Sequence, residues 1–264
     1  MTLPFQLLLF STDPALIRRL VRAGVAGVVV DWERAGKDER QAGADTQIAT
    51  DTLQDLERVR ASTEALVLCR VNPPGPRTTE EIDAAVDAGA DEILIPMVRS
   101  ADEVESVLDH VNGRCGVGIM VETIASVRCA ATLAELPITR AYAGLNDLAI
   151  ERKSPSIFTA VTDGTIARLR QLFSVRFGFG GLTLPDRGSP IPCRLLIAEM
   201  MRLRCDFGTL RRSFHRDIAG LEPATGVARI RESVNEAARR SGDDIERDHE
   251  ALVSAVRHLD TAPR

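Results

Sequence analysis

Two short apolar runs decide the fold, GIMVET at 118–123 and AYAGLNDL at 141–148. Each run is apolar enough to form a buried strand, and each delivers a carboxylate at its end, Glu122 in the first and Asp147 in the second. The residues between them, 124–136, have about the length of a crossover helix. If the two strands are parallel neighbours, their carboxylates emerge side by side at one rim. Such a pair suits a hard divalent cation such as Mg²⁺.

The same unit of strand, loop and helix recurs along the whole chain. Alternation of this kind indicates a parallel sheet, and eight units predict a closed (β/α)8 TIM barrel, which the length of 264 residues fits. Helices are expected at 14–24, opened by Asp13, and at 79–89, opened by Thr78. The strands are expected at 6–10, 27–32, 65–71, 92–96, 116–121, 140–145, 176–184 and 206–212.

The chain has more helix than a barrel needs. We expect residues 1–221 to form the barrel and 222–264 to form a C-terminal helical extension, with helices at 227–240 and 244–259. The first of these helices can close the barrel, but the second has no barrel position left. It either packs on a neighbouring subunit or forms a loosely ordered tail.

Composition excludes several classes of function. The net charge is −5 and basic residues are scattered, which disfavours binding to nucleic acid or to a membrane surface. The five cysteines are odd in number and lack CxxC spacing, so we expect reduced thiols, with Cys69 in the core, and no zinc site. No apolar stretch near the start is long enough to span a membrane, and we expect a soluble, cytoplasmic protein.

The predicted strand ends carry a set of acids and an arginine. Arg70 ends the third strand, while Asp31 and Glu33 end the second. A guanidinium is always charged and presents a fixed fork, so Arg70 is our candidate for stabilising negative charge on a substrate held by the metal at Glu122 and Asp147. The alternative is that these charges form surface salt bridges around the rim.

Five phrases in this order resemble the HpcH/HpaI aldolase and citrate lyase β-subunit superfamily. They are VVVDWERAGK, LCRVN, GADEILIPMVRSADEVE, GIMVETIASV and YAGLNDLAI, which together cover roughly residues 25–150. The resemblance implies a (β/α)8 barrel, a bound Mg²⁺ or Mn²⁺, and a reaction that makes or breaks a C–C bond through an enolate.

The resemblance also implies roles for particular residues. Glu122 and Asp147 match the metal ligands, and Arg70 matches the arginine that binds the oxo-acid and stabilises the enolate. We expect Gly144 and Asn146, on the same strand end as Asp147, to contact the substrate. Members commonly form trimers or hexamers with C-terminal helices crossing between subunits, so we expect a homo-oligomer.

One departure concerns the acid–base group. The aldolases of this superfamily carry His in an Asp-x-Glu-His phrase, and here that place is Arg34. An imidazole transfers protons near pH 7, whereas a guanidinium does not. Asp31, Glu33 or a metal-bound water would then take the acid–base role. Trp32 and Arg34 are expected to contact the substrate, and Arg34 with Lys37 would suit an anionic tail.

Three functions follow for testing. The first is a metal-dependent aldolase or lyase acting on a small oxo- or hydroxy-acid. The second is a CoA-ester lyase or hydrolase of the malyl- or citramalyl-CoA type, with the CoA diphosphate bound by a basic group drawn from Arg194, Arg202, Arg204, Arg211 and Arg212. The third is a non-catalytic, ligand-binding barrel that has lost its base.

Overall fold

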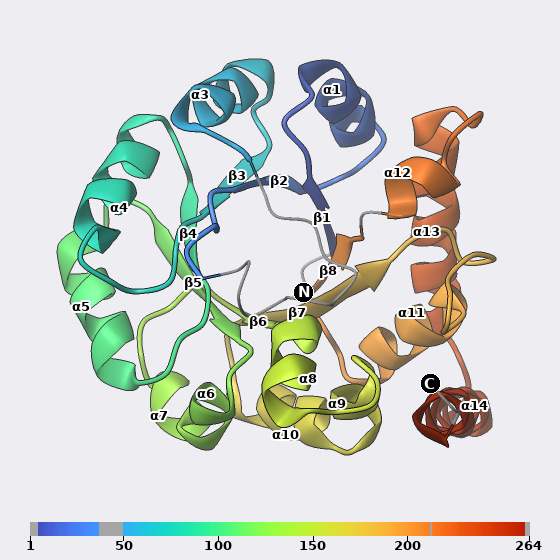
Figure 1. Ribbon diagram of the computed structural model, residues 1–264. Helices are drawn as coiled ribbons and strands as arrows, with labels where there is room; N and C mark the ends of the chain where they lie inside the picture. Colours follow the sequence, from blue (N-terminus) through green and yellow to red (C-terminus); the bar gives the residue numbers. More distant parts are fainter. Residues whose placement is uncertain (1–4, 37–49, 212, 262–264) are drawn as a thin grey trace.

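The computed structural model describes residues 5–36, 50–211 and 213–261. Eight parallel strands form a closed barrel in sequence order, with β8 hydrogen-bonded to β1 (Figure 1). The strands are β1 (Gln6–Phe10), β2 (Gly27–Asp31), β3 (Leu66–Arg70), β4 (Glu92–Ile95), β5 (Gly116–Val121), β6 (Arg140–Ala143), β7 (Arg176–Leu182) and β8 (Phe207–Leu210). Each lies within its expected range, so the predicted (β/α)8 barrel is confirmed.

Helices surround the strands, and all but the last of them follow the barrel wall (Figure 1). They are α1 (Pro14–Arg22), α3 (Leu53–Ser62), α4 (Thr78–Asp87), α5 (Ala101–Val111), α6 (Ile124–Arg128), α7 (Ala130–Leu133), α8 (Leu145–Arg152), α9 (Thr159–Thr162), α10 (Thr165–Leu172), α11 (Cys193–Arg202), α12 (Ser213–Asp217), α13 (Pro223–Ala238) and α14 (Gly242–Thr261). The segment expected to form one crossover helix at 124–136 forms two short ones, α6 and α7.

Helix starts follow the sequence signals in part. Asp13 caps α1 by accepting a hydrogen bond from the main-chain N–H of Ala15 at 2.8 Å, as expected. The expectation that Thr78 opens α4 is wrong, because the helix already includes Thr78 and its N-cap residue is Arg77. The Thr78 hydroxyl instead accepts a hydrogen bond from the Gly75 N–H at 2.7 Å, which ties down the preceding loop.

The two C-terminal helices have different positions. Helix α13 packs against both α1 and α11 and so fills the last place in the ring. Helix α14 lies outside the ring, against α11 and α9 (Figure 1). Its buried side chains Leu252 and Val256 belong to the main core. Contact of this extension with a neighbouring subunit stays a prediction.

The amino ends of the strands are closed by a buried ion pair. Arg140, the first residue of β6, donates from Nε to Glu92 Oε1 of β4 at 2.8 Å, and its guanidinium lies over the Phe207 ring. Cys69 of β3 belongs to the hydrophobic core, and burial raises its thiol pKa well above the ordinary value. Cys69 is therefore a core residue, as expected.

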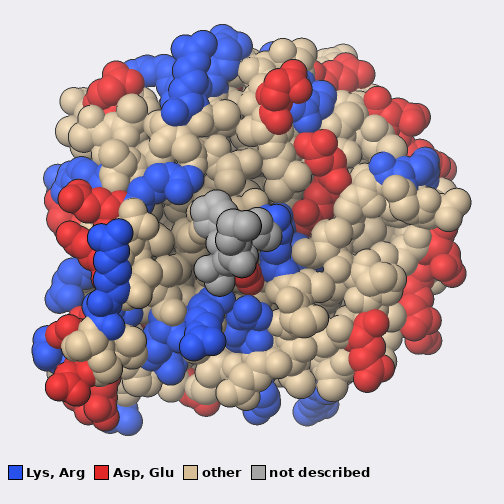
Figure 2. All heavy atoms as spheres, turned by 180° about the vertical axis from the view of Figure 1, so that it is seen from behind, with Lys and Arg blue, Asp and Glu red and all other residues tan. Residues whose placement is uncertain are grey.

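The outer surface carries charges of both signs. On the face opposite that of Figure 1, basic and acidic side chains are both widely distributed (Figure 2). Within the described residues, no helix is long and apolar enough to cross a membrane.

Candidate active site

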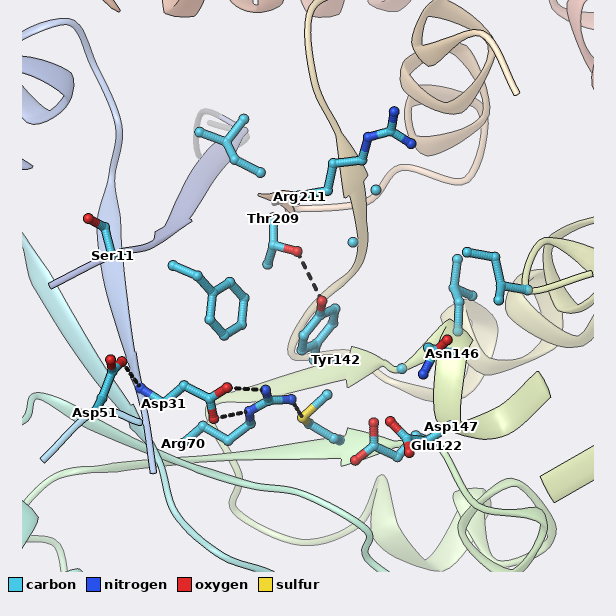
Figure 3. Close-up of a pocket in the computed structure, with 18 of the residues that line it drawn as sticks. Ser11, Asp31, Asp51, Arg70, Glu122, Tyr142, Asn146, Asp147, Thr209 and Arg211 are labelled. Atoms are coloured by element: carbon cyan, nitrogen blue, oxygen red, sulfur yellow. Dashed lines mark hydrogen bonds and ion pairs between the residues drawn. The ribbon is translucent and has the colours of Figure 1, made fainter. Parts of the chain in front are cut away.

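A cavity of about 690 Å³ lies at the carboxyl ends of the strands (Figure 3). This is the end of a (β/α)8 barrel where reacting groups are placed. Residues at or near the carboxyl ends of the strands supply much of its lining: Phe10, Asp31, Arg70, Met120, Glu122, Tyr142, Gly144, Gly180 and Thr209.

Arg70 is fixed by two acids of the neighbouring strand end. The register of β2 and β3 places Asp31 opposite Arg70, and the guanidinium donates from Nε to Asp31 Oδ1 at 2.8 Å and from Nη2 to Oδ2 at 2.5 Å. Glu33 Oε2 lies 3.1 Å from Nη1. Burial alone would lower the pKa of Arg70, but the charges of Asp31 and Glu33 outweigh it and raise the pKa. Arg70 is therefore a permanent, oriented positive charge.

Glu122 is held at the end of β5 with 1% of its surface exposed. The main-chain N–H of Met97 donates to Glu122 Oε1 at 2.9 Å. Gly144 lies directly against this carboxylate, because a Cβ at Gly144 would overlap Glu122 Oε2 and lie 2.6 Å from Glu122 Cβ. A residue with no side chain is therefore required at position 144 for Glu122 to take this place.

Asp147 lies in the first turn of α8, next to Glu122 (Figure 3). Its exposed fraction is 8%. The pKa of Glu122 is raised to about 8, first by burial and then by the negative charges of Asp147 and Glu33, against the opposing charge of Arg70. Two neighbouring buried carboxylates fit a divalent cation, whose charge would offset the repulsion that Asp147 exerts on Glu122.

The protein offers few ligands to a metal ion at this site. No group of three or more His, Cys, Asp or Glu side chains suited to a metal is found among the described residues. A cation at Glu122 and Asp147 would therefore need oxygen ligands from substrate or water. Mg²⁺ commonly binds in this way, through one or two carboxylates with the remaining ligands from outside the protein. The residues present fit Mg²⁺ or Mn²⁺.

Four residues were expected to contact the substrate, and the structure divides them into two pairs. Gly144 and Asn146 line the cavity. Trp32 and Arg34 line a separate, smaller surface hollow. Arg34 Nη2 donates to the main-chain oxygen of Asp51 at 2.7 Å, which holds its guanidinium there. Lys37, the expected partner of Arg34, lies outside the described residues.

The structure also brings groups to the cavity that the sequence did not single out. The Tyr142 hydroxyl and Thr209 Oγ1 are 2.9 Å apart, and burial raises the pKa of Tyr142. Asp51 accepts the N–H of Asp31 at 2.9 Å, and its pKa is raised, mainly by burial. His215 is exposed and also borders the cavity, with Nε2 3.3 Å from the Phe10 main-chain oxygen. Tyr142 was within reach of sequence reasoning, since strand alternation puts it on the same side as Gly144.

The structure is a (β/α)8 barrel with a buried carboxylate pair and an oriented arginine in one cavity at the carboxyl ends of its strands. A family model described as HpcH/HpaI aldolase/citrate lyase matches residues 5–141. That match spans more than half of the chain, and the chain belongs to this family. A comparison with curated proteins gives no significant match.

Solved structures share the fold at low sequence identity. An HpcH/HpaI aldolase from Desulfitobacterium hafniense DCB-2 is 12% identical, with a TM-score of 0.59 over 90% of this chain and 95% of the other. RipC from Yersinia pestis is 14% identical, with a TM-score of 0.57 over 93% and 100%. Tryptophan synthase from M. tuberculosis is 13% identical, with a TM-score of 0.59 over 88% and 93%. At these identities the likeness establishes the barrel alone.

Proposed function

We propose that the protein is a cytoplasmic, divalent-metal-dependent carbon–carbon lyase that cleaves or forms a small oxo- or hydroxy-acid through an enolate. The observation that carries the proposal is the buried Glu122–Asp147 pair in one cavity with Arg70. Membership of a family of aldolases and lyases supports the reaction class.

Glu122 and Asp147 would hold Mg²⁺ or Mn²⁺ from one side of the cavity. Such an ion supplies Lewis-acid polarisation of a carbonyl oxygen and neutralises charge that develops on it. The protein's own part is to hold the two carboxylates rigidly. The Met97 N–H and the close approach of Gly144 fix Glu122, while the start of α8 positions Asp147.

Arg70 would bind the substrate's oxygens and stabilise the negative charge of an enolate. Asp31 and Glu33 already occupy part of its fork. Its Nη1 also points at the Met120 sulfur at 3.6 Å, and a thioether is a weak acceptor. A substrate carboxylate or enolate oxygen would replace that contact with a stronger, charge-assisted hydrogen bond.

Carboxylates or water would transfer the proton in the reaction, because Arg34 stands at the position of the family's histidine. Asp31 borders the cavity, and the side chain of Glu33 is buried against Arg70. In cleavage, the proton of the substrate hydroxyl would pass to one of these carboxylates or to water as the C–C bond breaks. The same proton would return to the enolate carbon.

The CoA-ester alternative is not favoured by the positions of its proposed arginines. Arg202 is bound by Glu199, with Nη2 2.6 Å from Oε1, and Arg194 lies 4.0 Å from Asp248 of α14. Arg211 lines the cavity, and Arg212 lies outside the described residues. Failure to bind acetyl-CoA at millimolar concentration would remove this alternative.

The test is turnover by the purified protein with Mg²⁺ and a panel of 4-hydroxy-2-oxo acids, followed by coupled detection of pyruvate. We expect metal-dependent turnover that Glu122→Ala abolishes and that Glu250→Ala, an exposed control on α14, leaves unchanged. Turnover and metal binding that survive Glu122→Ala would show that the site is wrong. No turnover with intact metal binding would favour the non-catalytic alternative.

We also propose that the chain forms a homo-oligomer, a trimer or hexamer, to which the C-terminal extension contributes. Light scattering after size-exclusion chromatography would give the number of subunits. A monomer at micromolar concentration would contradict the proposal.

A further inference from the structure

The cavity has two chemically different sides. Glu122, Asp147 and Arg70 form one side. Arg211, which directly follows β8, lines the other. Figure 3 shows the hydroxyl pair of Tyr142 and Thr209 between Arg211 and the carboxylates. A substrate bound at the carboxylate pair therefore has room to extend past the hydroxyl pair toward Arg211.

The strand between the two sides is free of side chains where it borders the cavity. Gly180 and Gly181 of β7 both contribute to the lining. A Cβ at Gly180 would lie 2.6 Å from the Tyr142 hydroxyl and 2.7 Å from Thr209 Oγ1. The volume of about 690 Å³ is in the middle of the range for ligand pockets, roughly 300–1,000 Å³. A substrate of three or four carbons would leave much of it unfilled.

Arg211 is held in place by a chain of hydrogen bonds. Its Nε donates to Ser213 Oγ at 2.5 Å, and Ser213 Oγ donates in turn to Asp217 Oδ2 at 3.2 Å. Thr183 also donates to Asp217 Oδ2, at 2.5 Å, and so anchors the chain on the loop that follows β7. Arg211 Nη1 donates to the Ser189 main-chain oxygen at 3.3 Å. The guanidinium is thereby oriented without a bound ligand.

Unlike Arg70, Arg211 has no carboxylate within ion-pair distance among the residues that the structure describes. Its hydrogen bonds to described residues use Nε and Nη1 and go to a hydroxyl and a carbonyl, both neutral acceptors. The side chain is half-buried. A partly desolvated guanidinium that is fixed in a cavity wall, with no acidic partner in the described part of the chain, is suited to an anion supplied by a ligand.

We propose that Arg211 is a specificity-determining residue that binds a terminal anionic group, carboxylate or phosphate, of a longer oxo-acid. This inference rests on the proposed function for the position of the substrate's other end, the 2-oxo-acid group at Glu122, Asp147 and Arg70. The substrate class is then an oxo- or hydroxy-acid that is charged at both ends.

The test measures binding rather than turnover, by titration calorimetry of the full-length protein in Mg²⁺. The probes are 2-oxo dicarboxylates of six and seven carbons, 2-oxo monocarboxylates of equal length, and a 2-oxo acid of similar length that ends in a phosphate ester. The variants are Arg211→Gln, Arg211→Lys and Arg194→Gln. The last is the matched control, because the Arg194 side chain is 61% exposed on α11 and does not line the cavity.

We expect the wild-type protein to bind at least one doubly charged probe about tenfold more tightly than its monoacid partner, the order of one charge-assisted contact. Arg211→Gln should remove the difference, Arg211→Lys should keep part of it, and Arg194→Gln should keep all of it. The better of the carboxylate and phosphate probes identifies the terminal group. Circular dichroism shows that each variant is folded.

Equal binding of charged and neutral tails by the wild-type protein overturns the inference, as does a preference that survives Arg211→Gln. No binding of any doubly charged probe at millimolar concentration overturns it too. Glu122→Ala separates the two proposals, since it should abolish binding of the 2-oxo-acid group in both probe classes. If it changes nothing while Arg211→Gln removes the preference, the proposed metal site is wrong and the anion site stands.

Discussion

Replacing Glu122 by Gln tests the charge balance of the proposed metal site without any substrate. The amide oxygen still accepts from the Met97 N–H, so the substitution removes the charge and keeps the shape. In the unfolded chain Glu122 ionises near its ordinary value of 4.5, whereas burial and Asp147 raise its pKa in the folded protein to about 8. Folding at neutral pH therefore requires Glu122 to take up a proton, which lowers the free energy of unfolding.

The size of this penalty depends on pH in a defined direction. It is absent below about pH 4.5, where both states are protonated, grows between 4.5 and 8, and is constant above 8. A pH of 7 is about 2.5 units above the pKa of Glu122 in the unfolded chain. This difference corresponds to a penalty of about 3 kcal/mol. We expect metal-free Glu122→Gln to be more stable than the wild-type protein by this order at pH 7, and equally stable near pH 4.5.

The assay is urea unfolding in EDTA at pH 5, 7 and 9, with Glu250→Gln as the exposed control. Added Mg²⁺ should then stabilise the wild-type protein through binding to the folded state, and should not stabilise Glu122→Gln. A variant that is no more stable than the wild type at pH 7, or whose advantage does not change with pH, would refute the reasoning.

Three further predictions concern the site and the barrel. Gly144→Ala should displace the Glu122 carboxylate, cost about 1–3 kcal/mol in urea unfolding and remove stabilisation by Mg²⁺; unchanged stabilisation by Mg²⁺ would contradict this. Arg70→Lys cannot keep both hydrogen bonds to Asp31, so kcat/KM should fall about 10- to 100-fold. Wild-type kinetics in this variant would count against the proposal that Arg70 stabilises the enolate. Arg140→Met leaves Glu92 buried and unpaired, and should lower the free energy of unfolding by about 3–5 kcal/mol. The double variant Arg140→Met/Glu92→Leu should regain most of that loss. Equal stability of the single and double variants would contradict this.

The fold and the carboxylate pair were predictable because both depend on short-range patterns. Each strand is a local apolar run, and parallel neighbours bring Glu122 and Asp147 to the same end of the barrel whatever the rest of the chain does. The position of Arg70 at the end of the third strand was predictable in the same way. Its bidentate contact with Asp31 then depends on the register of β2 and β3, which strand patterns alone do not give.

The remaining features depend on contacts between distant segments. Arg34 comes three residues after the end of β2, and its main-chain N–H donates to the Asn72 side chain at 2.8 Å, beside the outer hollow that Arg34 lines. The Tyr142–Thr209 hydroxyl pair joins residues 67 positions apart and needs Gly180 between them. The orientation of Arg211 depends on its hydrogen bond to Ser213, which in turn is bound to Asp217. No local signal in the sequence carries these arrangements.

The central claim is that Glu122 and Asp147 hold a divalent cation beside Arg70. Anomalous diffraction from a crystal of the protein soaked in Mn²⁺ tests it most directly, since Mn²⁺ is a close substitute for Mg²⁺ at oxygen ligands. We predict a single strong anomalous peak within coordination distance of one oxygen of each carboxylate, absent from Glu122→Gln crystals. A peak elsewhere in the cavity, or no peak at a millimolar concentration of Mn²⁺, would contradict the account.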